Sequence, residues 1–197
     1  MSPPNETKGA TKTGRRDDVL EAAASLFASK GYDATSIRDI AQQVGLMSGS
    51  LYHHFASKED ILLHVHAKGV AQVTESVQQA LGACGDEPWE RLGGACRGHL
   101  TALLGHSPFS QVMTPQFPQR FEGTLREVLL EQRDTYEHLF RGFIEDLSLP
   151  ATVDANVLRR SLLGALNWTL TWYRADGEDS PEEIADAIVA IFRCRLD

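Results

Sequence analysis

The sequence has little of what marks disulfide-rich or zinc-bound proteins. It contains only three cysteines, Cys84, Cys96 and Cys194, and none of them stands in a CxxC pair. A small, odd number of widely spaced cysteines argues against a disulfide framework and for a reducing compartment. An apolar signal-peptide core is also missing, and the uncharged, mostly apolar stretch 161–173 is shorter than the roughly 20 residues that span a bilayer. We therefore expect a cytoplasmic protein with no membrane segment.

Catalytic motifs are absent as well. The sequence has no HExxH, no nucleophile elbow and no phosphate-binding glycine loop. Its seven histidines invite a metal-site interpretation, but His64 and His66 stand two apart and would point away from each other on a helix. We expect no enzyme activity, no cofactor and no metal site. A metal-dependent enzyme is kept as the alternative from a different class.

Strand-like alternation is missing throughout, and apolar residues recur every three to four positions instead. This spacing predicts an all-α protein. Residues 1–14, rich in Pro, Thr, Lys and Gly, are predicted to be a disordered arm. Helices are expected over 16–30, 36–44, 48–54, 58–81, 88–105, 121–147, 158–172 and 181–192, with a proline-broken stretch at 107–118.

A net positive charge, which a nucleic-acid binder often carries, is lacking: the formal charge is −8. The charge is unevenly distributed, however. Residues 61–197 hold 12 Lys and Arg against 19 Asp and Glu, whereas residues 1–16 hold four basic residues against Glu6 alone. Because phosphate contacts depend on a local patch, the acidic total does not exclude DNA binding near the N-terminus.

The most informative stretch present is TSIRDIAQQVGLMSGSLYHHFASKED, residues 35–60. Ile37, Ile40 and Val44 have helical spacing, Ser36 begins the helix with capping-box spacing to Asp39, and Gly45 ends it. A second short helix follows at once. Two short helices joined by a tight turn are typical of a module that presents one helix to the major groove of DNA.

With its flanks, this stretch resembles the TetR family of bacterial transcriptional regulators. The matching residues are LEAAASLFASKGYDATSIRDIAQQVG and GSLYHHFASKEDIL, between about Arg16 and Leu63. The resemblance implies nine or ten helices in two domains: a helix-turn-helix DNA-binding domain over 15–60, and a ligand-binding and dimerisation domain over 61–197. It implies a homodimer that binds double-stranded, palindromic operator DNA, in most cases as a repressor released by a small molecule.

The resemblance also implies which residues contact DNA, on the first turn and outward face of the third helix and at the neighbouring helix starts. Gly49 permits close backbone approach, Met47 suits a thymine methyl, and Lys58 resembles a phosphate clamp. Helix three has no Arg or Asn, the side chains that read bases best, so the operator sequence cannot be read. The predicted contacts are Thr35, Ser36, Arg38, Met47, Ser48, Gly49, Ser50, Tyr52, His53, His54 and Lys58.

Polar side chains on apolar helix stripes suggest a ligand pocket in the second half. Such groups need partners when buried, which either a ligand or a neighbouring helix supplies. The stretch LLGALNWTLTWYRADGEDSPEEIADAIVAIF resembles the end of regulators of fatty-acid and steroid degradation, several of which respond to acyl-CoA thioesters. A fatty acid or acyl-CoA effector is therefore expected, bound by Trp89, His99, Met113, Gln132, Arg133, Tyr136 and Trp168.

A dimer interface is predicted on the last two helices, because 161–173 is apolar on nearly all faces and needs cover on two sides. The predicted interface residues are Leu158, Leu162, Ala165, Thr169, Trp172, Ile184, Ile188 and Ile191. One alternative mode of regulation stays open: Cys84 and Cys96 flank a hinge at 82–88 and could instead form a redox switch. Glycines at 93, 94 and 98 predict either close helix packing or a pocket.

Overall fold

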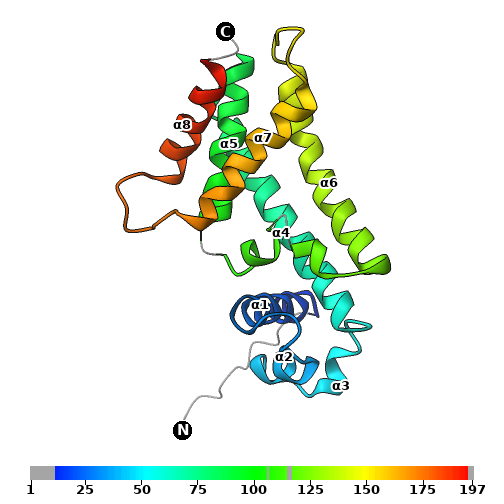
Figure 1. Ribbon diagram of the computed structural model, residues 1–197. Helices are drawn as coiled ribbons and strands as arrows, with labels where there is room; N and C mark the ends of the chain where they lie inside the picture. The colour runs from blue at the N-terminus through cyan, green and yellow to red at the C-terminus, as the bar shows by residue number, and fades with distance from the viewer. Residues whose placement is uncertain (1–11, 106, 115–116, 195–197) are drawn as a thin grey trace. The chain divides into compact units, whose positions relative to one another are not determined.

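The computed structural model describes residues 12–105, 107–114 and 117–194. Within these ranges the chain forms eight α-helices and three short 3-10 helices and no strand, which confirms the all-α prediction (Figure 1). The expected nine or ten helices are not reached in the described residues. The reason lies between α5 and α6, where prolines limit the chain to the 3-10 turns Ser110–Val112 and Phe117–Arg120.

The described chain divides into two compact units, one ending at Val65 and one beginning at His66. The first contains α1 (Lys12–Lys30), α2 (Ile37–Gln43), α3 (Ser48–Leu51) and the beginning of α4 (Lys58–Leu81). α1 starts at Lys12, so residues 12–14 are helical where the sequence predicts a disordered arm; residues 1–11 of that arm lie outside the described residues.

Local signals set the helix ends of the first unit. Gly31 and Gly45 have positive φ values of 84° and 66°, which only glycine adopts without strain, and they end α1 and close the turn after α2. Ser36 caps α2, and the Ser57 hydroxyl accepts a hydrogen bond from the amide of Asp60 at 3.1 Å at the start of α4. These ends follow the sequence prediction.

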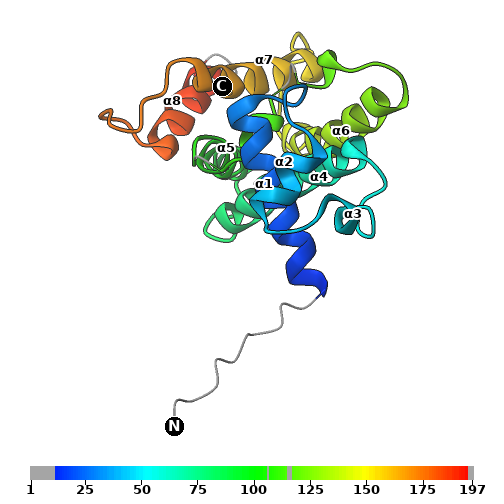
Figure 2. The same ribbon diagram turned by 90° about the horizontal axis from the view of Figure 1, so that it is seen from below.

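The second unit contains the remainder of α4, α5 (Pro88–Leu104), α6 (Gly123–Glu145), α7 (Ala155–Trp168), the 3-10 turn Thr169–Thr171 and α8 (Pro181–Arg193). α5 lies alongside α8 in both views and also packs on α6 and α7 (Figures 1 and 2). Leu100, Phe140 and Leu166 are fully buried in this core. α5 is therefore the central helix of the unit.

The glycines of α5 serve close packing. A Cβ built on Gly98 would lie 2.6 Å from Cα of Val77 on α4, and one on Gly94 would collide with Sγ of Cys84. Of the two interpretations open from the sequence, close helix packing holds at Gly98, and Gly94 packs closely on Cys84 of the loop after α4.

None of the described helices has both the length and the apolar character needed to cross a membrane.

Candidate functional site

The segment from α2 to the turns that follow α3 carries the exposed residues predicted to contact DNA. Met47 is 80% exposed and Tyr52 57%, while Leu51 and Phe55 are buried. The α-helix itself covers only four residues, and hydrogen-bonded turns continue it to Phe55. The other predicted contacts here are Arg38, Gly49 and His53, which are exposed, and Ser48, Ser50 and His54, which are half-buried.

Thr35 and Ser36 are engaged in local structure. Thr35 is 1% exposed, and its hydroxyl donates to the carbonyl oxygens of Gly31 (2.8 Å) and Leu26 (3.3 Å). The prediction that its side chain contacts DNA is therefore wrong, because the hydroxyl faces the interior. Ser36 forms the predicted capping box: Oγ accepts from the amide of Asp39 (3.1 Å) and donates to its carboxylate (2.7 Å).

Lys58 ties the start of α4 to the loop between α1 and α2. Its ammonium donates to the carbonyl oxygens of Tyr32 and Thr35, both at 3.0 Å, and lies 4.1 Å from the centre of the Tyr32 ring. An ammonium has three protons, so one is left for a phosphate. Lys58 thus has a structural role that the sequence did not indicate.

Arg16 holds the end of the α3 turn. It donates to the carbonyl oxygen of His54 (3.1 Å) and to Nε2 of His64 (2.6 Å), and its guanidinium lies 4.5 Å from the centre of the Phe55 ring. Nδ1 of His64 in turn donates to the carbonyl oxygen of Asp60 (2.7 Å). The sequence placed Arg16 at the start of the first helix and among the basic residues near the N-terminus, but it did not indicate these contacts, because interactions across 38 and 48 residues leave no local pattern.

Four of the predicted ligand residues meet at one small pocket in the second unit: His99, Met113, Arg133 and Tyr136. About 30 Å³ of the pocket is free, room for one or two water molecules and too little for an acyl chain. The other residues of its lining come from α4, α5, α6 and α7: Val73, Leu103, Glu137, Leu163 and Asn167. We call this the apolar pocket.

A buried polar pair forms part of its wall. Nδ1 of His99 lies 2.6 Å from the hydroxyl of Tyr136, and the two rings stack at 5.8 Å. Burial lowers the pKa of His99 to about 4, an effect that the nearby amide of Asn167 only partly offsets. Burial also raises the pKa of Tyr136 well above its usual value, so both side chains are neutral at pH 7.

The other three predicted ligand residues lie elsewhere. The amide oxygen of Gln132 is 2.7 Å from Nδ1 of the buried His66. Trp89 is half-buried with Arg193 at 5.8 Å from its ring, and Trp168 is 65% exposed. None of these three lines the apolar pocket, because their positions on the helices turn them to other neighbours.

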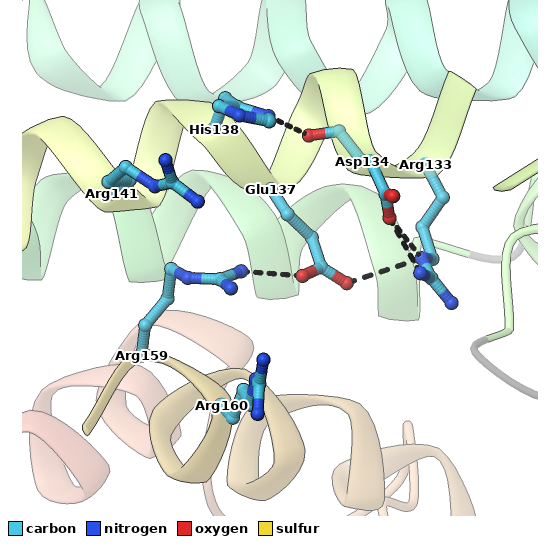
Figure 3. Close-up of a pocket in the computed structure, with 7 residues that line it drawn as sticks. All are labelled: Arg133, Asp134, Glu137, His138, Arg141, Arg159 and Arg160. Atoms are coloured by element: carbon cyan, nitrogen blue, oxygen red, sulfur yellow. Dashed lines mark hydrogen bonds and ion pairs between the residues drawn. The ribbon is translucent and has the colours of Figure 1, made fainter. Parts of the chain in front are cut away.

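A second cavity, of about 280 Å³, has four guanidinium groups around it (Figure 3). Its lining consists of Arg133, Asp134, Glu137, His138 and Arg141 from α6 and Arg159 and Arg160 from α7. Four arginines against two carboxylates make this arginine pocket a basic site in an acidic protein.

Only part of the positive charge in the arginine pocket is paired. The carboxylate of Glu137 accepts from Arg159 at 2.5 Å and lies 3.4 Å from Arg133, which also reaches Asp134 at 2.6 Å. Arg141 and Arg160 have no ion-pair partner among the described residues (Figure 3). Such a site is suited to an anion with several oxygens, because guanidinium groups bind phosphate in a planar, two-pronged way.

The two pockets have Arg133 and Glu137 in common in their linings and are therefore neighbours. Of the residues in the arginine pocket, the sequence pointed only to Arg133. A signal exists in the 133, 137, 141 spacing, which places three charged groups on one stripe of α6. Nothing local connects that stripe with Arg159 and Arg160 on α7.

Half of the predicted dimer residues lie inside the protomer. Leu158, Leu162, Thr169 and Ile184 are at most 7% exposed, so the prediction that they face a partner is wrong. They form the stripe that covers the protomer's own core. Ala165 and Ile188 are half-buried, and Trp172 and Ile191 are 50% and 67% exposed. On α7, Val157, Gly164 and Trp168 are exposed at helical spacing as well.

The thiols do not support a redox switch. Cys96 is fully buried, and burial raises the pKa of its thiol, which keeps it protonated and unreactive. Cys84 is half-buried, with its sulfur 3.5 Å from the Arg97 guanidinium; all three cysteines are free. Within 12–105, 107–114 and 117–194, no three His, Cys, Asp or Glu side chains gather as metal ligands would.

The exposed two-helix turn and the pocketed helical unit that follows it together define a helix-turn-helix transcriptional regulator. Residues 19–65 match the bacterial regulatory proteins of the tetR family, and residues 85–195 match the tetracyclin repressor-like C-terminal domain. The chain belongs to the TetR family.

Several relatives span nearly the whole chain. The transcriptional repressor KstR2 of Mycolicibacterium smegmatis is 30% identical, over 97% of this chain and 93% of its own length. AibR, solved in complex with isovaleryl coenzyme A and operator DNA, has a TM-score of 0.76 and 27% identity, covering 90% of this chain and 97% of AibR. PfmR of Thermus thermophilus has a TM-score of 0.71 and 31% identity, covering 88% and 95%. These relatives are regulators, and neither the enzyme nor the redox alternative is supported.

Proposed function

We propose that this protein is a cytoplasmic transcriptional repressor that binds a palindromic operator as a homodimer and is released by an acyl-CoA. Residues 15–60 bind DNA, and residues 61–197 bind the effector and dimerise. KstR2 is named a repressor, and AibR has been solved with both operator DNA and an acyl-CoA. A shared family and a similar fold support the same type of regulation here.

DNA contacts come from the exposed surface of α2, α3 and the turns beside them. Met47, Gly49 and Tyr52 present an apolar group, a bare backbone and a phenol to the groove. Hydrogen bonds to bases and phosphates come from the polar side chains of the same segment and from the third proton of Lys58. These side chains are Ser36, Arg38, Ser48, Ser50, His53 and His54. Because α3 has no Arg or Asn, base readout depends on these smaller groups and on DNA shape.

The effector class rests on one observation: the arginine pocket and the apolar pocket lie side by side, with Arg133 and Glu137 in both linings. An acyl-CoA has phosphates at one end and an apolar chain at the other. The unpaired Arg141 and Arg160 attract the phosphates, and the apolar pocket receives the acyl group. Arg133 lies at the junction of the two.

The apolar pocket is nearly closed, so acyl binding requires it to open. The half-buried Met113, an unbranched and adaptable side chain, is a suitable gate. An effector that binds the opened conformation more tightly shifts the population towards it, and the DNA affinity falls by the corresponding coupling free energy.

The homodimer forms through the exposed apolar residues of α7, α8 and the turn between them: Val157, Gly164, Trp168, Trp172 and Ile191. Ala165 and Ile188 lie at the edge of this surface. An apolar face of this kind needs a partner, and an isologous pair gives two heads for the two half-sites of a palindrome.

The test begins with an operator selected from random duplexes by the purified protein. Fluorescence anisotropy on that duplex is then followed while isovaleryl-CoA, octanoyl-CoA, free CoA or octanoate is added. Release by an acyl-CoA but not by octanoate supports the proposal. Release by none of the four compounds overturns the acyl-CoA assignment, and failure to select any duplex overturns DNA binding.

A pair of variants tests the arginine pocket in the same assay. Arg160→Gln should raise the acyl-CoA concentration that releases DNA roughly tenfold, because it removes a charge-assisted hydrogen bond. Arg174→Gln is the matched control, since Arg174 is 78% exposed, pairs with Asp176 and does not line the pocket. Equal effects of the two substitutions would argue against a phosphate site.

A further inference from the structure

One buried nitrogen in the apolar pocket lacks a hydrogen-bond partner. His99 is 4% exposed and lines the pocket, and its Nε2 makes no well-formed hydrogen bond to a described residue, although the side chain of Asn167 is near enough to raise the pKa of the ring slightly. Buried polar side chains are usually satisfied, and leaving one unsatisfied is costly. An unpartnered group on the wall of a pocket therefore points to something that the pocket takes up.

The hydrogen bond on the other ring nitrogen indicates which chemistry Nε2 offers. If the Tyr136 hydroxyl donates to Nδ1 of His99, the imidazole proton sits on Nε2 and this single N–H is unsatisfied. In the opposite arrangement Nδ1 donates, and then both the Tyr136 O–H and the lone pair of Nε2 lack a partner. The first arrangement leaves fewer unsatisfied groups, so Nε2 is a donor and its missing partner is an acceptor.

We propose that His99 selects an effector with a neutral carbonyl or hydroxyl oxygen in its acyl half, to which Nε2–H donates. The inference rests on the proposed function, because it takes the apolar pocket as the effector site. Tyr136 acts as a positioning residue that sets the tautomer of His99. Asn167 lines the same pocket and supplies a second polar group near the oxygen.

The surroundings favour a neutral oxygen over a carboxylate. Four residues of the lining around the pair are apolar: Val73, Leu103, Met113 and Leu163. Its two charged residues, Arg133 and Glu137, lie 3.4 Å apart and balance each other, so a desolvated carboxylate there would be costly. The lowered pKa of His99 agrees, since an imidazole that stays neutral at pH 7 offers no countercharge. The charged part of the effector belongs at the arginine pocket instead.

The first experiment compares three CoA ligands with the same five-carbon chain by calorimetry. Isovaleryl-CoA has the thioester carbonyl, S-(3-methylbutyl)-CoA replaces that carbonyl by methylene, and 3-hydroxyisovaleryl-CoA adds a hydroxyl. The wild-type protein should bind an oxygen-bearing ligand roughly tenfold more tightly than its oxygen-free counterpart. Weaker binding of the thioether would identify the thioester carbonyl as the acceptor, and stronger binding of the hydroxy ligand an oxygen on the chain.

The matched variant is His99→Phe combined with Tyr136→Phe, which removes both polar partners and leaves an apolar wall. Because both members of the buried polar pair are removed together, neither is left without its partner, and this variant should fold; thermal unfolding checks that it does. It should bind the three ligands with no preference for oxygen. The inference would be overturned if the variant kept the preference for oxygen-bearing ligands, or if the wild-type protein showed none. Nε2–H would then donate to an ordered water only.

A second experiment does not depend on CoA. If none of the three ligands binds, the acyl-CoA effector of the proposed function fails, and the His99 inference is then decided by ¹⁵N-histidine NMR. The Nε2–H signal of His99, assigned with the double variant, should shift on addition of 4-methyl-2-pentanone and stay in place with 2-methylpentane. No shift with the ketone would overturn the inference by itself.

Discussion

The guanidinium of Arg159 donates to the carboxylate of Glu137 at 2.5 Å, and Arg133 approaches the other oxygen of the same carboxylate at 3.4 Å. Arg159 is 8% exposed, and its Nε is buried without a hydrogen-bond partner among the described residues. A single carboxylate thus balances two arginines on a wall common to both pockets. Loss of this carboxylate would leave both arginines without it and make the site more positive.

Glu137→Gln should lower the melting temperature by several degrees, because a largely buried arginine loses its counter-ion. The same change should tighten acyl-CoA binding several-fold, since it removes a negative charge beside the proposed phosphate site. Calorimetry and thermal unfolding measure the two effects. Glu131→Gln, on an exposed position of α6 outside both pockets, is the control and should change neither.

Tyr52→Phe and Lys58→Met should separate DNA contact from folding. Tyr52 is 57% exposed, so loss of its hydroxyl should weaken operator binding several-fold and leave thermal stability unchanged.

Lys58→Met should lower the free energy of unfolding by about 1–3 kcal/mol, because the carbonyl oxygens of Tyr32 and Thr35 lose their donor. Denaturant unfolding and anisotropy on the selected operator measure both. A Lys58 variant with unchanged stability would contradict the structural role.

Stability should fall as the pH drops below about 6.5. Burial lowers the pKa of His99 from 6.5 to about 4, so the unfolded chain takes up a proton in this range and the folded protein does not. The contribution of His99 to the free energy of unfolding is fully present above pH 6.5. It is lost progressively as the pH falls to 4, and the total loss from this group is up to about 3 kcal/mol. The lowered pKa of His66, also caused by burial, acts in the same direction.

Urea unfolding between about pH 4.5 and 7.5 measures this slope. The double variant His99→Phe/Tyr136→Phe should retain only the part due to His66 and the carboxylates. A slope that does not change in this variant would contradict the assignment to His99.

Gly98→Ala should destabilise the second unit by about 1–3 kcal/mol, because its Cβ would press on the backbone of Val77. Gly142→Ala is the control: Gly142 lies in α6 with open space around its Cβ position, so alanine should stabilise the protein by up to about 1 kcal/mol. Chemical denaturation of the two variants should give opposite signs. Equal effects would contradict the close α4–α5 contact.

Gly164→Arg should abolish the dimer and leave the protomer folded. Gly164 is exposed on α7 and has open space around it in the protomer, but a large charged side chain there would lie in the proposed interface. Gly142→Arg, at a similarly open position of α6, should stay dimeric. Analytical ultracentrifugation distinguishes the two. If the Gly164→Arg variant remained dimeric, the dimer interface would have to lie on another face of the protein.

The sequence by itself determined the helices, the helix ends that local caps and glycines set, and the family; the starts of α1 and α7 were not among them. Gly31, Gly45, the Ser36–Asp39 capping box and the Ser57 and Ser180 caps act within a few residues, so their effect is readable along the chain. The same holds for the inward side of α3: Leu51 and Phe55 stand four residues apart, a helical spacing, and both are buried.

Only the tertiary structure decided which face of each helix meets which neighbour. Leu162 and Thr169 satisfy an apolar stripe equally well as core or as interface, and burial assigns them to the core. The arginine pocket joins α6 to α7, and His99 meets Tyr136 across 37 residues. Helix ends are stabilised by interactions between residues a few positions apart, so the sequence shows them directly. Pockets depend on contacts between distant segments, which no local pattern encodes.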